Sequence, residues 1–238
     1  MRKNYSCCLL LLLTCCSLPN TGLAAQPERK FSFRLQISVM LATVRISDPI
    51  TGKTGSGVLI GNKGNEYYVL TARHIVTGVR SPCLTVYTLN SFPRPASTYN
   101  NSQLLSQDKE QDLAVIRFTA AEKTYPVLPL CTNRNTPVAT NFSGLVTGFV
   151  GNNKPEKKII RVIGKKRIRL PGQAAKWAWE ITPEQPVGYS GGPLVSKSGQ
   201  LIGIASGSNN GKGYYAYTSE IHRFLKQNSL QWLSKEEK

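Results

Sequence analysis

The sequence predicts an all-β fold in which two antiparallel barrels or sandwiches pack together and one α-helix follows them. Two groups of about six short apolar segments flank a proline-rich stretch, and Gly, Asn and Pro separate the segments. The final segment changes from the strand period of two to the period of a helix. A single continuous sheet is the less favoured arrangement.

The first 25 residues have the layout of a cleaved secretory signal peptide. Arg2 and Lys3 precede an apolar run from about Cys7 to Leu18, and small residues follow up to Ala25. The run is short for a membrane-spanning helix, and a retained membrane anchor is the alternative. We therefore expect a secreted or periplasmic protein with an N-terminal leader over residues 26–33.

The first β unit is expected over residues 34–124. Its strand-like segments are rich in β-branched and aromatic residues. They are "RLQISVMLATVRI" (34–46), "TGSGVLIG" (54–61), "NEYYVLTA" (65–72), "CLTVYTL" (83–89) and "DLAVIRF" (112–118). The polar stretch 91–103 reads as a long surface loop.

A linker is expected over residues 125–137, where prolines are frequent, and a second β unit over 138–218. The second unit contains "NFSGLVTGF" (141–149), "KKIIRVIG" (157–164), "KWAWEIT" (176–182), "LIGIASG" (201–207) and "GYYAYTS" (213–219). In "KWAWEIT", the side chains of Trp177, Trp179 and Ile181 alternate with those of Lys176, Ala178 and Glu180. Such alternation predicts a strand with one buried face.

Residues 219–238 are predicted to form the C-terminal helix. Ile221, Phe224 and Leu225 fall on one helical face, and Leu233 extends it. Ser219 or Thr218 is suited to cap its start.

The cysteines and the charge restrict the class of protein. Four of the six cysteines precede residue 25, which leaves Cys83 and Cys131. In an exported protein these two can form a disulfide, and two buried unpaired thiols are the alternative. Cys and His residues do not cluster with metal-ligand spacing, so we expect no metal and no cofactor.

The net charge is +17, and +15 without the first 25 residues, which contain two Lys/Arg and no Asp/Glu. Residues 154–170 hold eight Lys/Arg against one Glu. This basic stretch is either a solvated strand face or a patch that binds polyanions, acidic substrates or an anionic surface. Export and the lack of a nucleic-acid-binding motif argue against nucleic acid as the partner.

The segment "GYSGGPLV" (188–195) places Ser190 among three glycines and a proline. A serine hydroxyl becomes a nucleophile when a base lies within hydrogen-bond reach and a third group orients that base. His74 follows an apolar strand directly, whereas His222 reads as ordinary helix surface. Asp112 begins a buried strand and needs a partner, so we prefer it over Asp108 as the orienting acid.

The N–H groups of Gly188 and Ser190 could converge in this turn to stabilise an oxyanion. A plain tight turn between two strands is the alternative explanation of the glycines.

"VLTARHIV", "QDLAVIRF" and "GYSGGPLV", in this order, resemble the trypsin/chymotrypsin-like serine proteases, and "TGSGVLI" resembles their exported HtrA-related bacterial branch. The resemblance covers roughly residues 34–225. It implies a chymotrypsin-like fold of two six-stranded β-barrels with the active site between them. It also implies that His74 is the general base, Asp112 orients it, Ser190 attacks the scissile carbonyl, and Gly188 and Ser190 form the oxyanion hole.

The resemblance assigns further residues to the polypeptide substrate. "ASGS" (205–208) resembles the strand that pairs with the substrate backbone, with Ser206 supporting the aspartate and Gly207 and Ser208 beside it. Glu184 resembles the residue at the base of the specificity pocket, where it would favour Lys or Arg. A glutamate that faces solvent is the alternative, and the one we prefer.

The sequence also departs from relatives in the family. Tyr189 stands where the animal digestive enzymes have an aspartate that pairs with a newly cut N-terminus, and no "IVGG"-type opening is present. No PDZ segment is expected after the terminal helix, so the assembly of full-length HtrA proteins is not carried over. The expected function is a serine endopeptidase, acting broadly, or mainly on itself or one partner in the envelope. The alternative is a non-catalytic binding module that uses the basic stretch 154–169.

Overall fold

The computed structural model describes residues 31–79, 81–120, 124–132, 140–151, 154–171 and 173–234. The predicted signal peptide and most of the leader lie outside these residues. Within them, no helix combines the length and the apolar character needed to cross a membrane.

The first half forms a seven-stranded antiparallel sheet in the order β5-β4-β1-β2-β3-β7-β6. Its strands are β1 (Thr43–Ser47), β2 (Thr54–Lys63), β3 (Glu66–Thr71), β4 (Cys83–Val86), β5 (Ser97–Tyr99), β6 (Gln103–Asp108) and β7 (Leu113–Thr119). The short helix α2 (Arg73–Val76) follows β3. The expected loop 91–103 contains strand β5, because Ala96 and its neighbours hydrogen-bond to the edge of β4.

The second half forms a closed antiparallel barrel in the order β10-β13-β12-β11-β8-β9. Its strands are β8 (Phe142–Gly148), β9 (Glu156–Ile168), β10 (Lys176–Thr182), β11 (Pro193–Val195), β12 (Leu201–Asn209) and β13 (Lys212–Tyr217). The predicted all-β architecture of two antiparallel units is therefore confirmed, although the first unit has seven strands rather than six.

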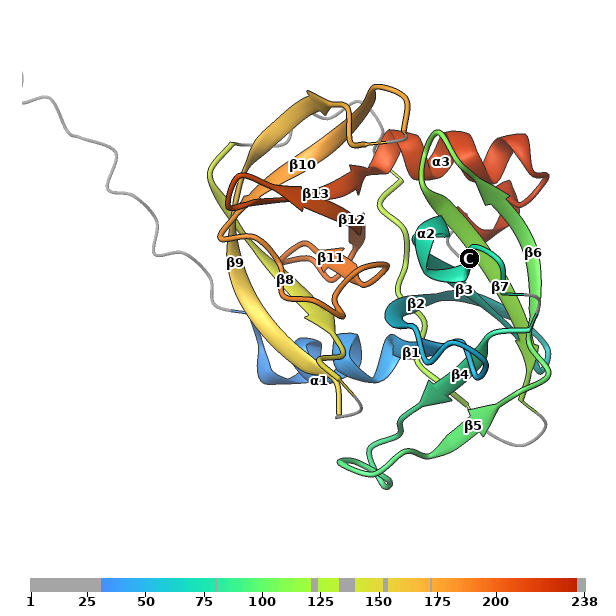
Figure 1. The fold of residues 1–238 in the computed structure, drawn as a ribbon. Helices are drawn as coiled ribbons and strands as arrows, with labels where there is room; N and C mark the ends of the chain where they lie inside the picture. Colours follow the sequence, from blue (N-terminus) through green and yellow to red (C-terminus); the bar gives the residue numbers. More distant parts are fainter. Residues whose placement is uncertain are drawn as a thin grey trace, which may run out of the picture.

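The segment 34–46 was expected to be a strand, and this prediction is wrong for most of it. Helix α1 (Phe33–Ala42) precedes β1, and the Ser32 hydroxyl caps it by accepting a hydrogen bond from the N–H of Leu35 at 3.2 Å. Leu, Met, Gln and Arg in this segment favour a helix, and its buried end contacts both halves of the molecule. Figure 1 shows α1 lying below β8 and β9 and leading into β1.

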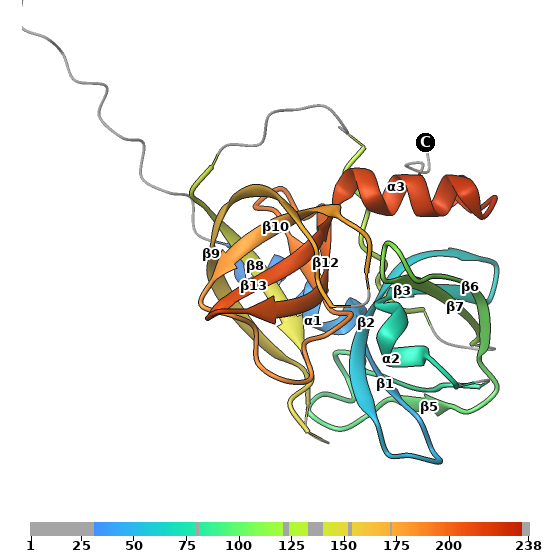
Figure 2. The ribbon, with the colours of Figure 1, turned by 45° about the horizontal axis from the view of Figure 1, so that its top comes forward.

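One hydrophobic core joins the two halves, which Figures 1 and 2 show side by side, with helix α3 (Thr218–Gln227) starting at their junction and running over the first unit. The linker takes part in this core, since the N–H of Leu128 donates to Leu59 O and the N–H of Cys131 donates to Leu201 O. The core draws on α1, both β units, the linker and α3, and includes Val39, Val58, Leu70, Leu128, Leu130, Leu145, Ile204, Phe224 and Leu233. The two halves are thus held as one packed body.

The C-terminal helix is confirmed in type and buried face. Ile221, Phe224 and Leu225 are buried, and Leu233 is buried in a short 3-10 turn, Gln231–Ser234. The expected cap by Ser219 or Thr218 is wrong: the N-cap is Tyr217, and the Thr218 hydroxyl donates to Ile202 O.

Strand β10 departs from the simple alternation that its sequence predicts. Trp179 and Ile181 are buried as expected, but Trp177 is 39% exposed while Lys176 is only 2% exposed. The reason is tertiary, because the start of β10 faces the other half of the molecule rather than solvent. Lys176 Nζ donates a hydrogen bond to Gln111 O of the first unit at 2.8 Å.

Candidate active site

His74 and Asp112 lie together because β3 and β7 are neighbours, so the turn after β3 meets the turn before β7. His74 Nδ1 is 2.9 Å and 3.1 Å from the two carboxylate oxygens of Asp112. The backbone N–H of His74 donates to Asp112 Oδ1 at 3.0 Å, and that of Arg73 donates to Asp112 O at 3.1 Å. Because a carboxylate accepts hydrogen bonds, Nδ1 carries the proton and Nε2 is left to accept one.

Asp112 is 2% exposed and has a backbone φ of 55°, a left-handed conformation that aspartate tolerates better than most residues. Burial raises the pKa of this carboxyl, but the hydrogen bond and charge of His74, the charge of Lys176 and the hydroxyl of Ser206 outweigh it. Its pKa therefore lies below the ordinary value, and the group is a carboxylate at neutral pH. Asp108 instead accepts a hydrogen bond from the N–H of Gln111 at 2.8 Å.

Ser206 reaches Asp112 from the second barrel. The pairing of β12 with β13 shifts register between Ala205 and Gly207, so Ser206 lies in a β-bulge. A bulge re-aims the side chain of the extra residue. The Ser206 hydroxyl donates to Asp112 Oδ2 at 2.7 Å.

Ser190 is half-buried on the loop between β10 and β11. The N–H of Gly191 donates to Ala205 O at 2.8 Å, which ties the loop to the residue before Ser206. Gly191 also lies against the turn that carries His74, because a Cβ atom there would overlap Ser56 O and Thr71 Oγ1 and lie 3.0 Å from Ala72 N. The serine loop is thus placed between the histidine turn and the strand of Ser206.

Ser56 of β2 fixes the serine loop and is fully buried. Its N–H donates to Ser190 O at 2.8 Å and its hydroxyl donates to Gly188 O at 2.6 Å. The same hydroxyl accepts a hydrogen bond from the N–H of Phe149 at 3.0 Å. The carbonyl groups of Gly188 and Ser190 are therefore directed towards β2.

Gly188 adopts a φ of 96°, and a Cβ atom there would overlap Phe149 O. Only glycine fits a position that combines a left-handed φ with such a close approach. Within the described residues, the N–H groups of Gly188 and Ser190 donate to no acceptor. Two such donors beside a serine hydroxyl are what an oxyanion site requires.

Tyr189 is fully buried in the second barrel, where its ring fills the space beside Gly148. Burial, with a smaller contribution from Glu156, raises the pKa of Tyr189 to about 12, so the phenol is uncharged. In the part of the chain that the structure describes, its hydroxyl has no hydrogen-bond partner. Packing rather than an ion pair holds the residue before Ser190.

The residues expected to contact substrate lie in β12 and in the loop after β10. Glu184 is exposed and its N–H donates to Gly211 O, Gly207 is half-buried, and Ser208 is exposed. Gln185 was not singled out from the sequence, yet its side-chain amide donates to Gly207 O at 2.8 Å. An amide therefore already occupies one backbone acceptor of the expected substrate-binding strand.

Of the two alternatives for the cysteines, unpaired thiols are observed, and the surface position expected of His222 is wrong. Cys83 and Cys131 are free thiols, since Cys83 starts β4 in the first unit whereas Cys131 packs against the second barrel. His222 is 6% exposed rather than on the surface, and its Nε2 is 2.8 Å from Cys131 O. The helix turns this ring into the junction with the linker.

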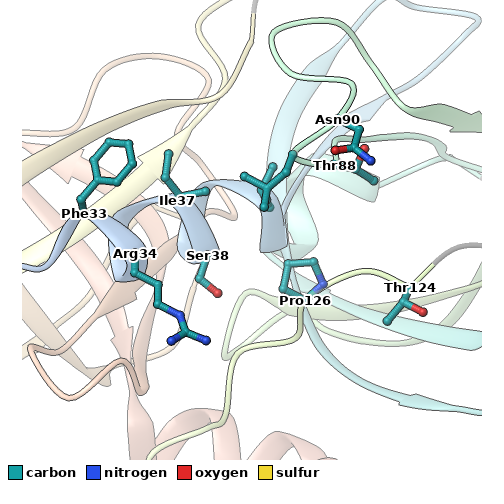
Figure 3. Close-up of a pocket in the computed structure, with 10 residues that line it drawn as sticks. Phe33, Arg34, Ile37, Ser38, Thr88, Asn90, Thr124 and Pro126 are labelled. Carbon is teal, nitrogen blue, oxygen red and sulfur yellow. The ribbon is translucent and has the colours of Figure 1, made fainter.

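The described residues contain no group of three His, Cys, Asp or Glu side chains that could hold a metal ion. A groove of about 870 Å³ lies away from His74, Asp112 and Ser190, between α1, the loop after β4 and the linker. Figure 3 shows Ile37 of α1 on one side and Asn90 and Pro126 on the other.

A histidine–aspartate pair from one β unit and a serine loop from the other are the elements expected of a serine peptidase. The sequence profile of the trypsin-like peptidase domain matches residues 55–204, more than half of the chain. The chain therefore belongs to the trypsin-like peptidase family.

Relatives with similar sequences are named as serine proteases. HhoA of Synechocystis sp. is 30% identical over 153 residues, which are 63% of this chain and 36% of that protein. An HtrA-like serine protease of Staphylococcus aureus strain RF122 is 23% identical over 165 residues, which are 65% of this chain and 20% of that protein. The chain thus matches only a minor part of the length of these relatives.

Solved structures share the fold. The serine endoprotease from Yersinia pestis has a TM-score of 0.65 and 22% identity, over 84% of this chain and 68% of that chain. The active form of the Rv3671c protease from M. tuberculosis has a TM-score of 0.64 and 22% identity, over 81% and 82% of the two chains. The chymotrypsin-like fold class predicted from the sequence is confirmed.

Besides Gln185, two residues that contact this site were missed by sequence reasoning, Ser56 and Lys176. Ser56 stands inside "TGSGVLI", which drew attention only as a family pattern, and nothing local distinguishes its hydroxyl from that of any strand serine. Lys176 opens an alternating strand, and its burial depends on the other β unit. Neither role leaves a signal in the local sequence.

Proposed function

We propose that the chain is an endopeptidase that hydrolyses peptide bonds through an acyl-enzyme on Ser190. His74 removes the proton of the Ser190 hydroxyl through Nε2 while Oγ forms a bond to the scissile carbonyl carbon. Asp112 keeps the proton on Nδ1 and stabilises the imidazolium that forms. The carbonyl oxygen becomes an oxyanion, and the N–H groups of Gly188 and Ser190 stabilise it.

The intermediate then collapses and the carbon–nitrogen bond breaks. The imidazolium gives its proton to the departing amine, which leaves the acyl group on Ser190. A water molecule repeats the sequence, with His74 first accepting its proton and then returning a proton to Ser190 Oγ. The carboxylic acid product leaves and the starting state is restored.

The observation that carries this proposal is the set of hydrogen bonds that holds two separate elements at one place. Asp112 is bonded to both His74 and Ser206, while Gly191 ties the serine loop to Ala205 beside Ser206. A non-catalytic module would not need a buried carboxylate aligned on an accessible imidazole. The side chain of His74 is 37% exposed, which leaves a face for substrate.

Labelling with a fluorophosphonate probe tests the nucleophile directly. We expect the probe to label Ser190, and Ser190→Ala to abolish labelling and lower peptide turnover by about 10⁴-fold or more with the fold retained. Ser198→Ala, a change in an exposed turn, is the matched control and should be labelled normally. A Ser190→Ala protein that cleaves casein at the parent rate would show that the proposal is wrong.

The basic strand β9 favours a second property, binding of acidic polymers or acidic partners. Seven of the eight Lys/Arg in residues 154–169 are exposed and Lys157 is half-buried, whereas only Glu156 there is acidic. Glu180, on the adjacent strand, offsets part of this charge by pairing with Lys166 and Lys212. Such a face attracts polyanions and does so less strongly at high salt.

Retention on heparin resin tests this face. Replacing Arg161, Lys165 and Arg167 by Ser should lower the salt concentration at which the protein elutes. Replacing Lys63, Lys109 and Lys226, which lie elsewhere, is the control for net charge. If the two triple variants elute at the same salt concentration, β9 is an ordinary charged face without a special role in binding.

We also propose export, as a secreted or periplasmic protein. The last residues of the expected leader already belong to the fold, since Phe31 is part of the core and Ser32 caps α1, so a cleavage near Ala25 would leave both in the mature chain. N-terminal sequencing of the exported protein should place the cleavage near Ala25. Recovery of uncut chain in the membrane fraction would favour the retained anchor instead.

A further inference from the structure

The start of β10 carries a buried lysine that the proposed mechanism does not use. We propose that Lys176 is a positioning residue whose ammonium group, bonded to Ser206 behind Asp112, sets the pH range in which His74 can accept a proton. This inference rests on the proposed peptidase function. It concerns how that site is tuned rather than whether the site exists.

Hydrogen bonds connect Lys176 to the imidazole without a gap. Lys176 Nζ donates to Ser206 Oγ at 2.8 Å, Ser206 Oγ donates to Asp112 Oδ2 at 2.7 Å, and the same oxygen is 2.9 Å from His74 Nδ1. An ammonium group can only donate hydrogen bonds. It therefore directs the single proton of the Ser206 hydroxyl onto Asp112.

The position of the ammonium group is fixed from two β units. Its second acceptor is Gln111 O, the carbonyl directly before Asp112, at 2.8 Å. Burial lowers the pKa of Lys176 to about 8, although Asp112 and Asp108 act in the opposite direction. Near neutral pH the group is still mainly cationic. Because it is buried, solvent screens its charge only weakly from the neighbouring Asp112.

Other charged groups near this chain of bonds are accounted for. Asp108 lies in the same turn as Asp112 and contributes negative charge. Glu220 of α3 accepts the N–H of Trp177 and pairs with Arg223. Lys53 donates to the carbonyl of His74 on the exposed side. Lys176 is thus the cation directly behind the carboxylate.

The direction of the effect follows from charge. The carboxylate of Asp112 favours an imidazolium at His74, and a cation behind Asp112 partly offsets that negative charge. Removing the cation should shift the acidic limb of the activity profile to higher pH. The three hydrogen bonds limit the separation of Lys176 Nζ and His74 Nδ1 to about 8 Å, and Coulomb's law at an effective dielectric near 20 then gives a shift of about one pH unit or more.

The test compares Lys176→Met with Lys166→Met over the pH profile of kcat/KM. Both variants lose one lysine charge from neighbouring strands, but Lys166 is exposed and paired with Glu180. We expect the acidic midpoint to rise by about one pH unit in Lys176→Met and by less than about 0.3 unit in Lys166→Met. Equal midpoints in Lys176→Met and the parent would overturn the proposal.

A readout without turnover separates this inference from the proposed function. In a Ser190→Ala background, the His74 ring is titrated by NMR with and without Lys176→Met, and we expect the same shift of about one pH unit. If the parent neither cleaves peptides nor reacts with the probe, the proposed function fails while this titration still decides the role of Lys176. An unchanged titration, with an active parent, defeats the inference alone.

The unsubstituted lysine provides the measurement if Lys176→Met does not fold. In the Ser190→Ala protein with labelled lysine, one lysine resonance should titrate with a midpoint near 8. The His74 ring should show a second inflection at the same pH. The absence of that shared inflection would overturn the proposal.

Discussion

Ser56→Ala should uncouple the serine loop from strand β2. The lost hydroxyl donates to Gly188 O at 2.6 Å and accepts from Phe149 N at 3.0 Å, at a position with no exposed area. The substitution therefore leaves one buried carbonyl and one buried N–H without a partner. Each unsatisfied buried group costs about 1–3 kcal/mol, so the two together should lower the free energy of unfolding by about 2–6 kcal/mol.

The same change should slow catalysis more than it weakens substrate binding. Gly188 is a proposed oxyanion donor, and its orientation depends on the hydrogen bond that Ser56 makes to its carbonyl. We expect kcat to fall by about 10–100-fold with KM changed by less than about threefold, because the contact matters most in the transition state.

Two measurements check this prediction, and Ser198→Ala serves as the control for both. Urea unfolding in a Ser190→Ala background gives the stability without self-cleavage. Burst kinetics with an activated ester gives the acylation rate in the active background. A Ser56→Ala protein with the parent urea midpoint and the parent acylation rate would refute the reasoning from these hydrogen bonds.

Three further predictions follow from single positions. Gly191→Ala should lower the free energy of unfolding, measured in urea, by about 3 kcal/mol or more, because a Cβ atom there overlaps Ser56 O. Gly52→Ala, at a position with a similar φ but open space, should lower it by about 1 kcal/mol. Equal losses in the two variants would contradict the close approach at Gly191. The pKa of Lys176 is lower in the folded than in the unfolded chain, so the unfolded chain binds more protons between about pH 8 and 10.5 and the free energy of unfolding rises with pH there. Lys176→Met should remove up to about 1.4 kcal/mol per pH unit of that slope. An unchanged slope would refute this prediction. Because Tyr189 is buried without a charge, a few residues added before Gln26 should change kcat/KM by less than about twofold; loss of activity that trimming restores would reveal an activating cut.

Much of the site could be predicted because its chemistry depends on residue types in a fixed order. A histidine after an apolar strand, an aspartate before another and a serine among glycines predicted His74, Asp112 and Ser190, and the structure brings the first two into contact. The contact of Ser206 with Asp112 was expected only through the family resemblance, and the structure contains it. The glycines at 188 and 191 both have the positive φ that such a turn needs.

Local pattern failed where long-range contacts outweighed it. The apolar run over residues 34–46 was interpreted as a strand, yet residues 33–42 form a helix that the Ser32 cap and burial against both β units stabilise. Cys83 and Cys131 have no sequence signal that separates a disulfide from two thiols, because only the fold sets the distance between them. His222 lies on a helix whose surface is partly covered by the linker.

The sequence by itself determined the β class, the two-unit division, the terminal helix and the identities of the proposed catalytic residues, since periodicity and residue chemistry are local properties. The tertiary structure alone decided that Ser56 holds the serine loop, that Gln185 covers Gly207 and that Lys176 is buried behind Asp112. Each of these depends on which side chains from distant segments meet when the two units pack. A lysine in an alternating strand is expected on the surface, and its burial is recognised only when the residues that cover it are known.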